Sequence, residues 1–196
     1  MVIMMIMLSL SGLLGLQGLY DGMISHMINT TIRSDSGEIS LYAKAYRLHK
    51  SLDQRISNVS NLEKRLSEVE GIDAYAIRLE QEGLVATAHK SLGAKLKGIS
   101  LENEKEFGGL DAFITQGEYS FGKDDKKALI GSALAKKFNL TIGSRVIFTA
   151  QDATGEINSI SFRISGILKT GNISIDEHTV FISMEKISKF LNLQQS

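Results

Sequence analysis

The first twenty residues of this chain carry no charged side chain, and this feature constrains the fold more than any other. All 22 basic and all 22 acidic residues of the 196-residue sequence follow residue 20. A helix of this length is about 30 Å long, which matches the hydrocarbon thickness of a bilayer. A soluble domain of this size cannot easily surround such a helix on every side. The stretch therefore predicts a transmembrane helix.

The residues that flank the span indicate on which side of the membrane the rest of the chain lies. Between residues 21 and 40, Arg33 is the only Lys or Arg, so this flank lacks the basic excess of a cytoplasmic loop. The stretch has neither the basic leader nor the cleavage pattern of a signal peptide. We expect residues 1–33 to form the span and a short stalk, with the rest outside. Because the span starts at Met1, we also expect a truncated start or a fragment.

Alternating apolar and polar residues predict strands in the remaining sequence. Strands are predicted at residues 39–43, 75–79, 92–96, 128–130, 145–149, 160–168 and 179–182. A turn is predicted near residues 81–83, where a glycine stands. In the strand around residues 92–96, Lys95 and Lys97 are predicted on a solvent-exposed face. In the strand over residues 160–168, Arg163 and Ser165 are predicted to point outward.

Helices are predicted between these strands from capping residues and apolar spacing. Ser60 and Ser132 are predicted as N-terminal caps, and a last helix containing Met184 is expected to end at Leu193. Residues 100–150 begin with a polar, glycine-bearing region that predicts a smaller inserted subdomain. The sequence therefore predicts an α+β fold, in which a transmembrane helix precedes a mixed, mainly antiparallel domain over residues 34–193.

Composition and motifs argue against an enzyme. The formal net charge is zero, so the chain lacks the basic excess of a nucleic-acid binder, and it has no cysteine. The spacing of residues 117–124 imitates a phosphate-binding loop, but Asp124 replaces the Ser or Thr that would hold magnesium. The histidines are scattered without metal-ligand spacing, at His26, His49, His89 and His178. We therefore predict no catalytic residue, no metal site and no cofactor.

Two segments carry a family resemblance. They are LIGSALAKKFNLTIGSRV at residues 129–146 and FRISGILKTG at residues 162–171, followed by Asp176 and residues 180–182. Together they resemble the extracytoplasmic core domain of ABC-transporter permeases of the lipoprotein-releasing (LolC/LolE) and macrolide-exporter (MacB) types. The chain departs from that pattern at Asn139, where the family usually has glycine, and at Ser144, where it usually has aspartate. It resembles only the first helix and the external domain of such a permease.

The resemblance implies a non-catalytic permease subunit in the bacterial inner membrane, with its main domain in the periplasm. The implied partners are membrane lipid, a cytoplasmic ATPase subunit that hydrolyses ATP, and a second permease subunit in a homo- or heterodimer. The implied cargo is a lipoprotein that is extracted from the membrane and passed to a periplasmic carrier. Two alternatives stay open: a MacB-type efflux permease for drugs or peptides, and a single-pass membrane-anchored interaction module or truncated permease fragment.

Overall fold

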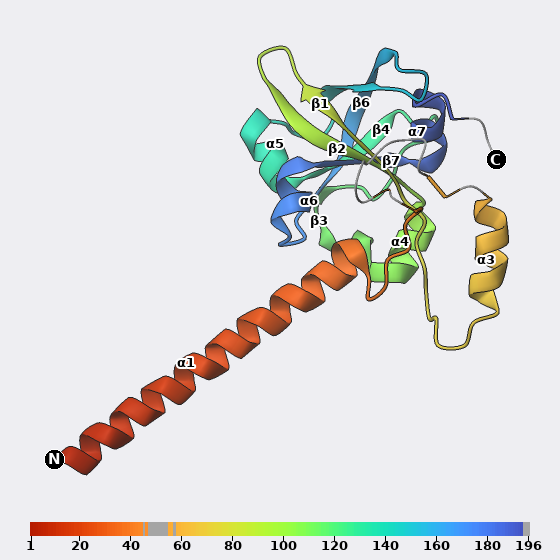
Figure 1. Ribbon diagram of the computed structural model, residues 1–196. Helices are drawn as coiled ribbons and strands as arrows, with labels where there is room; N and C mark the ends of the chain where they lie inside the picture. Colours follow the sequence, from red (N-terminus) through yellow and green to blue (C-terminus); the bar gives the residue numbers. More distant parts are fainter. Residues whose placement is uncertain (45, 47–54, 57, 194–196) are drawn as a thin grey trace.

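The computed structural model describes residues 1–44, 46, 55, 56 and 58–193, and it shows one long helix attached to a domain built on a single sheet (Figure 1). The helix, α1 (Val2–Thr31), extends away from the domain, and none of its side chains is buried. Among the described residues, it is the one helix long and apolar enough to cross a membrane. A π-helical turn, η1 (Ile32–Ser36), connects it to the domain.

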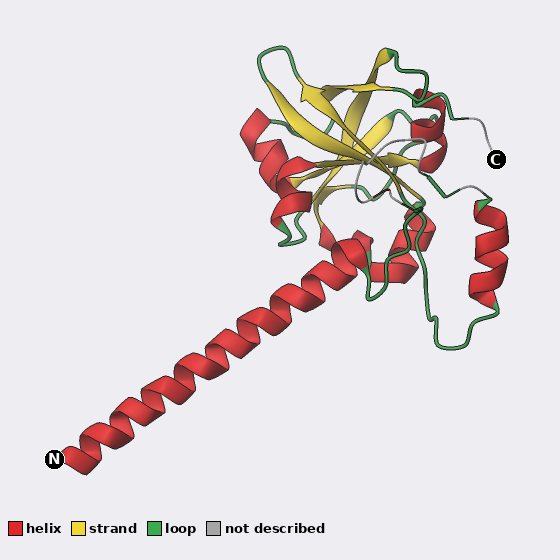
Figure 2. Cartoon of the chain, in the orientation of Figure 1, coloured by secondary structure: helices red, strands yellow, loops and turns green. Residues whose placement is uncertain are grey.

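The sheet is mixed and mainly antiparallel, as predicted (Figure 2). Its strands are β1 (Leu79–Ala86), β2 (Ser91–Ile99), β3 (Ile114–Gly117), β4 (Lys127–Gly131), β5 (Arg145–Gln151), β6 (Ile157–Leu168) and β7 (Thr179–Ser183). They follow the order β3-β6-β4-β7-β2-β1-β5, and only the β2–β7 and β4–β6 pairs among them are parallel. Because β5 also pairs with β6, the six strands β6, β4, β7, β2, β1 and β5 close into a ring. The remaining strand, β3, pairs with β6 outside this ring.

Short helices complete the α+β fold, and the first of them has no buried residue and lies apart from the sheet (Figure 1). They are α3 (Val59–Ser67), α4 (Leu101–Gly108), the 3₁₀ helix η3 (Leu110–Phe113), α5 (Ser132–Phe138), α6 (Ile173–His178) and α7 (Met184–Phe190). Leu134 and Phe138 of α5 are buried, as the sequence predicted. Asn139 ends α5 in the left-handed conformation with φ 54°, which Asn tolerates better than most residues.

Two hydrophobic clusters form the core, one on each face of the sheet. In β7, Val180 and Ile182 belong to the larger cluster, while Phe181 between them belongs to the smaller one. The larger cluster receives residues from every strand of the ring and from α5 and α7. The smaller cluster lies outside the ring beneath η3 and α6. Alternate side chains of a strand point to opposite faces, so a strand buried on both sides reads as a continuous apolar run.

The structure corrects several boundary predictions. Residues 39–43 form no strand, and Ile39 is 83% exposed. No turn occurs at residues 81–83, because β1 continues through Gly83 and the hairpin turns at residues 87–90. A Cβ at Gly83 would lie 2.4 Å from the backbone oxygen of Thr149. This glycine therefore permits a close strand approach and not a turn.

The predicted helix caps are also displaced. The α3 helix is capped by Asn58, whose side chain accepts a hydrogen bond from the backbone of Asn61, and Ser60 lies inside the helix. The N-cap of α5 is Gly131, with no side-chain hydrogen bond from Ser132.

Residues 100–150, predicted as a smaller subdomain, contribute β3, β4 and β5 to the common sheet. Strand pairing over long sequence distances, which local patterns do not contain, decides this arrangement.

Candidate functional site

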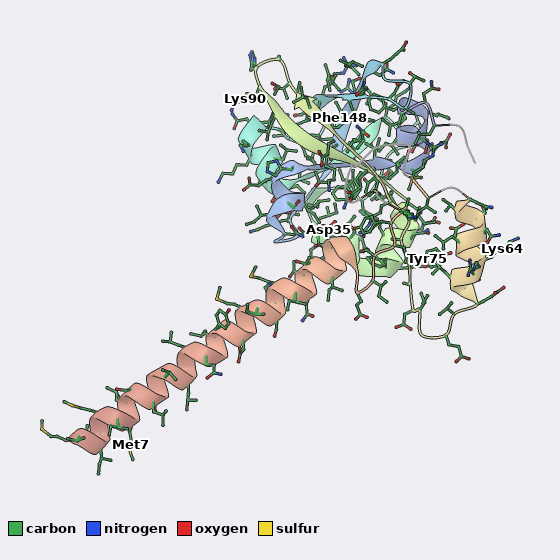
Figure 3. All side chains as sticks on the ribbon, viewed as in Figure 1. Met7, Asp35, Lys64, Tyr75, Lys90 and Phe148 are labelled. Carbon is green, nitrogen blue, oxygen red and sulfur yellow. The ribbon has the colours of Figure 1, made fainter. Side chains whose placement is uncertain are left out.

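The first candidate region is the junction, which we define as the part of η1, α4, β1 and β2 where the apolar helix meets the domain. Figure 3 shows Asp35 at this point, directly beyond the end of α1. Gly37 follows with φ 63° and ψ −175°, a conformation that is accessible almost only to glycine. A Cβ at Gly37 would lie 2.6 Å from Cζ of Phe107. The chain therefore enters the domain by passing closely over the Phe107 ring.

A buried lysine at the centre of the junction binds two carboxylates. Lys97 of β2 is only 2% exposed, and its Nζ lies 2.6 Å from Oδ1 of Asp35 and 2.8 Å from Oε1 of Glu80. Lys95 reaches the other oxygen of Glu80 at 2.8 Å. Glu80 and Lys97 face each other in the register of β1 and β2. Two positive and two negative side chains therefore form one neutral network.

The network changes the pKa of its members. Burial by itself raises the pKa of Glu80, but attraction to Lys97 and hydrogen bonds from Lys95 and Lys97 overcome it and lower the pKa to about 2. Burial would likewise lower the pKa of Lys95, yet the hydrogen bond to Glu80 and its charge leave that pKa raised. Glu80 and Lys95 are therefore charged over the physiological pH range and attract each other across β1 and β2.

A second ion pair holds α4 beside the junction. Arg78 donates from Nε and Nη2 to the two carboxylate oxygens of Glu104, with an Nη2–Oε2 distance of 2.7 Å. The guanidinium carbon of Arg78 lies 5.0 Å from the ring centre of Phe107. Although burial acts to lower the pKa of Arg78, Glu104 raises it. Arg78 thus ties the segment before β1 to the same Phe107 ring over which Gly37 passes.

Sequence reasoning missed this junction. It placed Lys97 on a solvent-exposed face because Lys95 and Lys97 alternate with apolar residues, but Lys97 is buried. The reason is that the turn after α1 brings Asp35 onto that face of β2, 62 residues away in sequence. Arg78 and Glu104 are separated by 26 residues. The sequence signal was the presence of Lys95 and Lys97 on one predicted strand. This signal does not identify which acidic residues pair with them.

The second candidate region, the basic row, consists of Lys127, Arg145 and Arg163 on three strands. In the sheet register, Arg163 of β6 faces Lys127 of β4 on one side and Arg145 of β5 on the other. All three are exposed, and none forms an ion pair within the part of the chain that the structure describes. Like charges directly opposite each other destabilise a sheet. The outward prediction for Arg163 agrees with this exposure, whereas Ser165 is buried at a bulge in β6.

The other residues singled out from the sequence do not converge. Residues 117–124 lie mainly in the connection between β3 and β4, and Asp124 pairs with Lys126 at 3.3 Å. His26 is on α1, His89 is in the β1–β2 turn, and His178 ends α6. His49 is outside the described residues. Among those that are described, no group of three His, Cys, Asp or Glu side chains is placed to hold a metal ion.

The fold and the junction define a class of protein: an α+β domain joined to a helix that is long and apolar enough to cross a membrane. The profile of the MacB-like periplasmic core domain matches residues 1–196, so the chain belongs to that family. The predicted membership of the MacB-like ABC permease family is confirmed, and the chain is part of an ABC transporter permease subunit. The predicted fold class is confirmed as well.

One solved structure of a family member shows the same fold, and a second is similar over much of its length. The periplasmic region of MacB from Actinobacillus actinomycetemcomitans is 17% identical with a TM-score of 0.52, over 79% of this chain and 67% of that one. The extracellular domain of the noncanonic ABC-type transporter YknZ from Gram-positive bacteria is 16% identical with a TM-score of 0.47, over 78% and 75%. No curated protein sequence matches this chain significantly.

Proposed function

We propose that the permease containing this chain extracts lipoproteins from the bacterial inner membrane and passes them to a soluble periplasmic carrier. A separate cytoplasmic subunit hydrolyses ATP, and a second permease subunit completes the transporter. The α1 helix transmits movement to the periplasmic domain through the junction. The observation that supports carrier docking is the basic row, whose three cations have no ion-pair partner among the residues that the structure describes.

The surroundings of the basic row suit a protein partner. Ile147 follows Arg145 by two residues on the outer face of β5, and it is exposed opposite Ser161. Leu84 of β1 is also exposed and faces Thr149 of the same strand. An apolar strip therefore borders the cations. A carrier that shields acyl chains needs an apolar opening, and acidic residues around that opening would complement Arg145 and Arg163, because guanidinium groups bind carboxylates with two parallel hydrogen bonds.

Removing the two arginines is the direct test. In the complete transporter, Arg145→Gln with Arg163→Gln is expected to weaken carrier binding at least about 100-fold, since each charge-assisted hydrogen bond contributes about 1.5–3 kcal/mol. Biosensor titration of the carrier measures this change, and membrane fractionation of cells measures lipoprotein retained in the inner membrane. ATP hydrolysis and the melting temperature should not fall, because the substitutions remove like-charge repulsion from the sheet.

The control is Lys136→Gln, which removes an exposed cation of α5 away from the basic row. It should leave carrier binding and lipoprotein release unchanged. Equal weakening by the control would show non-specific charge attraction, and unchanged binding by the double variant would remove the basic row as the docking surface. Either result contradicts the proposed hand-over to a carrier at this surface.

A MacB-type efflux permease for drugs or peptides is the second candidate, and its support is the fold match to the MacB periplasmic region. Depletion of the permease separates the two functions. Accumulation of lipoproteins in the inner membrane supports lipoprotein release, whereas normal lipoprotein sorting with increased sensitivity to macrolides or peptides supports efflux. A single-pass anchored interaction module is supported instead if no ATPase subunit copurifies with the full-length product.

A further inference from the structure

The backbone between α1 and the domain has the geometry of a hinge. The amide of Gly37 donates to the oxygen of Ile32 at 3.0 Å, which closes a π-helical turn directly after the regular α1 helix. Such π-helical turns are rare and are frequently found at functional sites. Gly37 then has its positive φ. The chain therefore changes direction within residues 32–37, where the α-helix becomes a π-helical turn and Gly37 adopts a conformation that favours glycine.

The ion pair between Asp35 of this hinge and Lys97 of the sheet can open without leaving a buried charge unpaired. Asp35 is 34% exposed, whereas Lys97 is 2% exposed and also contacts Glu80. If Asp35 moves away, it becomes hydrated and Lys97 keeps Glu80 as its partner. Opening the pair between Arg78 and Glu104 would instead leave the carboxylate of Glu104 buried and unpaired, which is strongly unfavourable.

We infer that the Asp35–Lys97 contact is a releasable latch that fixes the orientation of α1 against the periplasmic domain, with residues 32–37 as its hinge. Lys97 and Glu80 remain paired in both orientations and keep the sheet intact. Release of Asp35 lets α1 turn about η1 without unfolding the domain. The inference goes beyond the proposed function and holds whichever cargo the transporter carries, because it concerns only the helix and the domain of this chain.

Distance measurements between spin labels test the latch directly. The chain has no cysteine, so His26→Cys on α1 and Lys136→Cys on α5 place the only two labels. In the full chain in phosphatidylcholine nanodiscs, we expect one narrow distance distribution with Asp35 present. With Asp35→Asn, which keeps the shape and removes the charge, we expect at least a twofold broader distribution or a second distance. Asp35→Glu, which restores a carboxylate, should return the distribution toward its original width.

Two controls separate a latch from a general loss of structure. Glu185→Gln breaks an exposed ion pair on α7 and should leave the distribution unchanged. Labels at Lys136→Cys and Ser159→Cys, both within the domain, should report the same distance with and without Asp35→Asn. A narrow distribution that survives Asp35→Asn overturns the latch, as does broadening of the within-domain distance by the same substitution. These readouts need neither cargo nor carrier, so they can fail independently of the proposed function.

Discussion

Replacement of Gly131 by alanine is expected to lower the free energy of unfolding by about 3 kcal/mol, at the upper end of the usual range for overpacking a core. A Cβ at this position would lie 2.4 Å from the backbone oxygen of Asp176 and 2.5 Å from that of Ile175. The first turn of α5 and the helix α6 would therefore have to separate. The melting temperature of the full chain in detergent, followed by circular dichroism, is expected to fall by roughly 10 °C.

The backbone of α6 cannot easily move away, because Asp176 is fixed on its other side. The buried carboxylate accepts hydrogen bonds from the backbone and hydroxyl of Thr170 and from the backbone of Gly171. A shift of α6 would stretch these bonds or leave buried donors unpaired, which costs about 1–3 kcal/mol for each group. The clash at Gly131 is consequently transmitted to the loop that follows β6.

The matched control is Gly93→Ala in β2. No atom lies within 4 Å of a Cβ built at Gly93, so the change in unfolding free energy should stay within about 0.5 kcal/mol. A comparable loss in both variants would mean that alanine in this domain is unfavourable for a reason other than close approach. An unchanged melting temperature for Gly131→Ala would contradict the close contact between α5 and α6.

The contrast between Gly131 and Gly83 shows what the sequence can and cannot predict. At Gly131 a strand pattern stops and a helix pattern starts, so local spacing places the glycine correctly at the boundary. At Gly83 a turn was predicted because glycine interrupts an alternating pattern, yet β1 continues and packs against Phe148 and Thr149. The same residue type serves both roles, and only the approach of a distant strand distinguishes them.

The basic row and the junction also differ in how far the sequence could predict them. The exposure of Arg163 follows from simple alternation along β6, but its two basic neighbours become visible only when β4 and β5 are placed beside it. The junction was not predicted, because the contact between Asp35 of η1 and Lys97 of β2 spans 62 residues of sequence. Sequence patterns thus predicted the elements of the last third of the chain and left their mutual contacts open.

The junction and the basic row lie on one folded domain, and the sheet connects them physically. Lys97 of β2 anchors the end of α1, β2 pairs with β7, β7 with β4, and β4 carries Lys127 of the basic row. A rigid closed sheet moves as one body when α1 changes its orientation, since its interior is closely packed. Movement of the helix would therefore reposition the proposed docking surface without rearranging the strands within it.

Acid should selectively weaken the junction through Glu80. Its pKa is about 2 in the folded chain against an ordinary value of 4.5, so the stabilisation is present above that ordinary value. It is lost as the pH falls from about 4.5 to about 2, because protonation removes the charge that Lys97 and Lys95 attract. The loss is on the order of 3 kcal/mol, since one pKa unit corresponds to about 1.4 kcal/mol. Attraction to the charge of Lys97, together with the hydrogen bonds from Lys95 and Lys97, outweighs burial and is the physical source of this dependence.

Denaturant unfolding of the full chain in detergent between pH 7 and pH 2 measures the effect, with Glu80→Gln as the reference. At neutral pH the unaltered chain is expected to be more stable than the variant by roughly 3 kcal/mol. The difference should shrink below about pH 4.5 and become small near pH 2, where about half of the folded chains carry a protonated Glu80. A difference that stays constant over this range would mean that the carboxylate of Glu80 does not hold β1 and β2 together through Lys97, and the latch would then lack its fixed side.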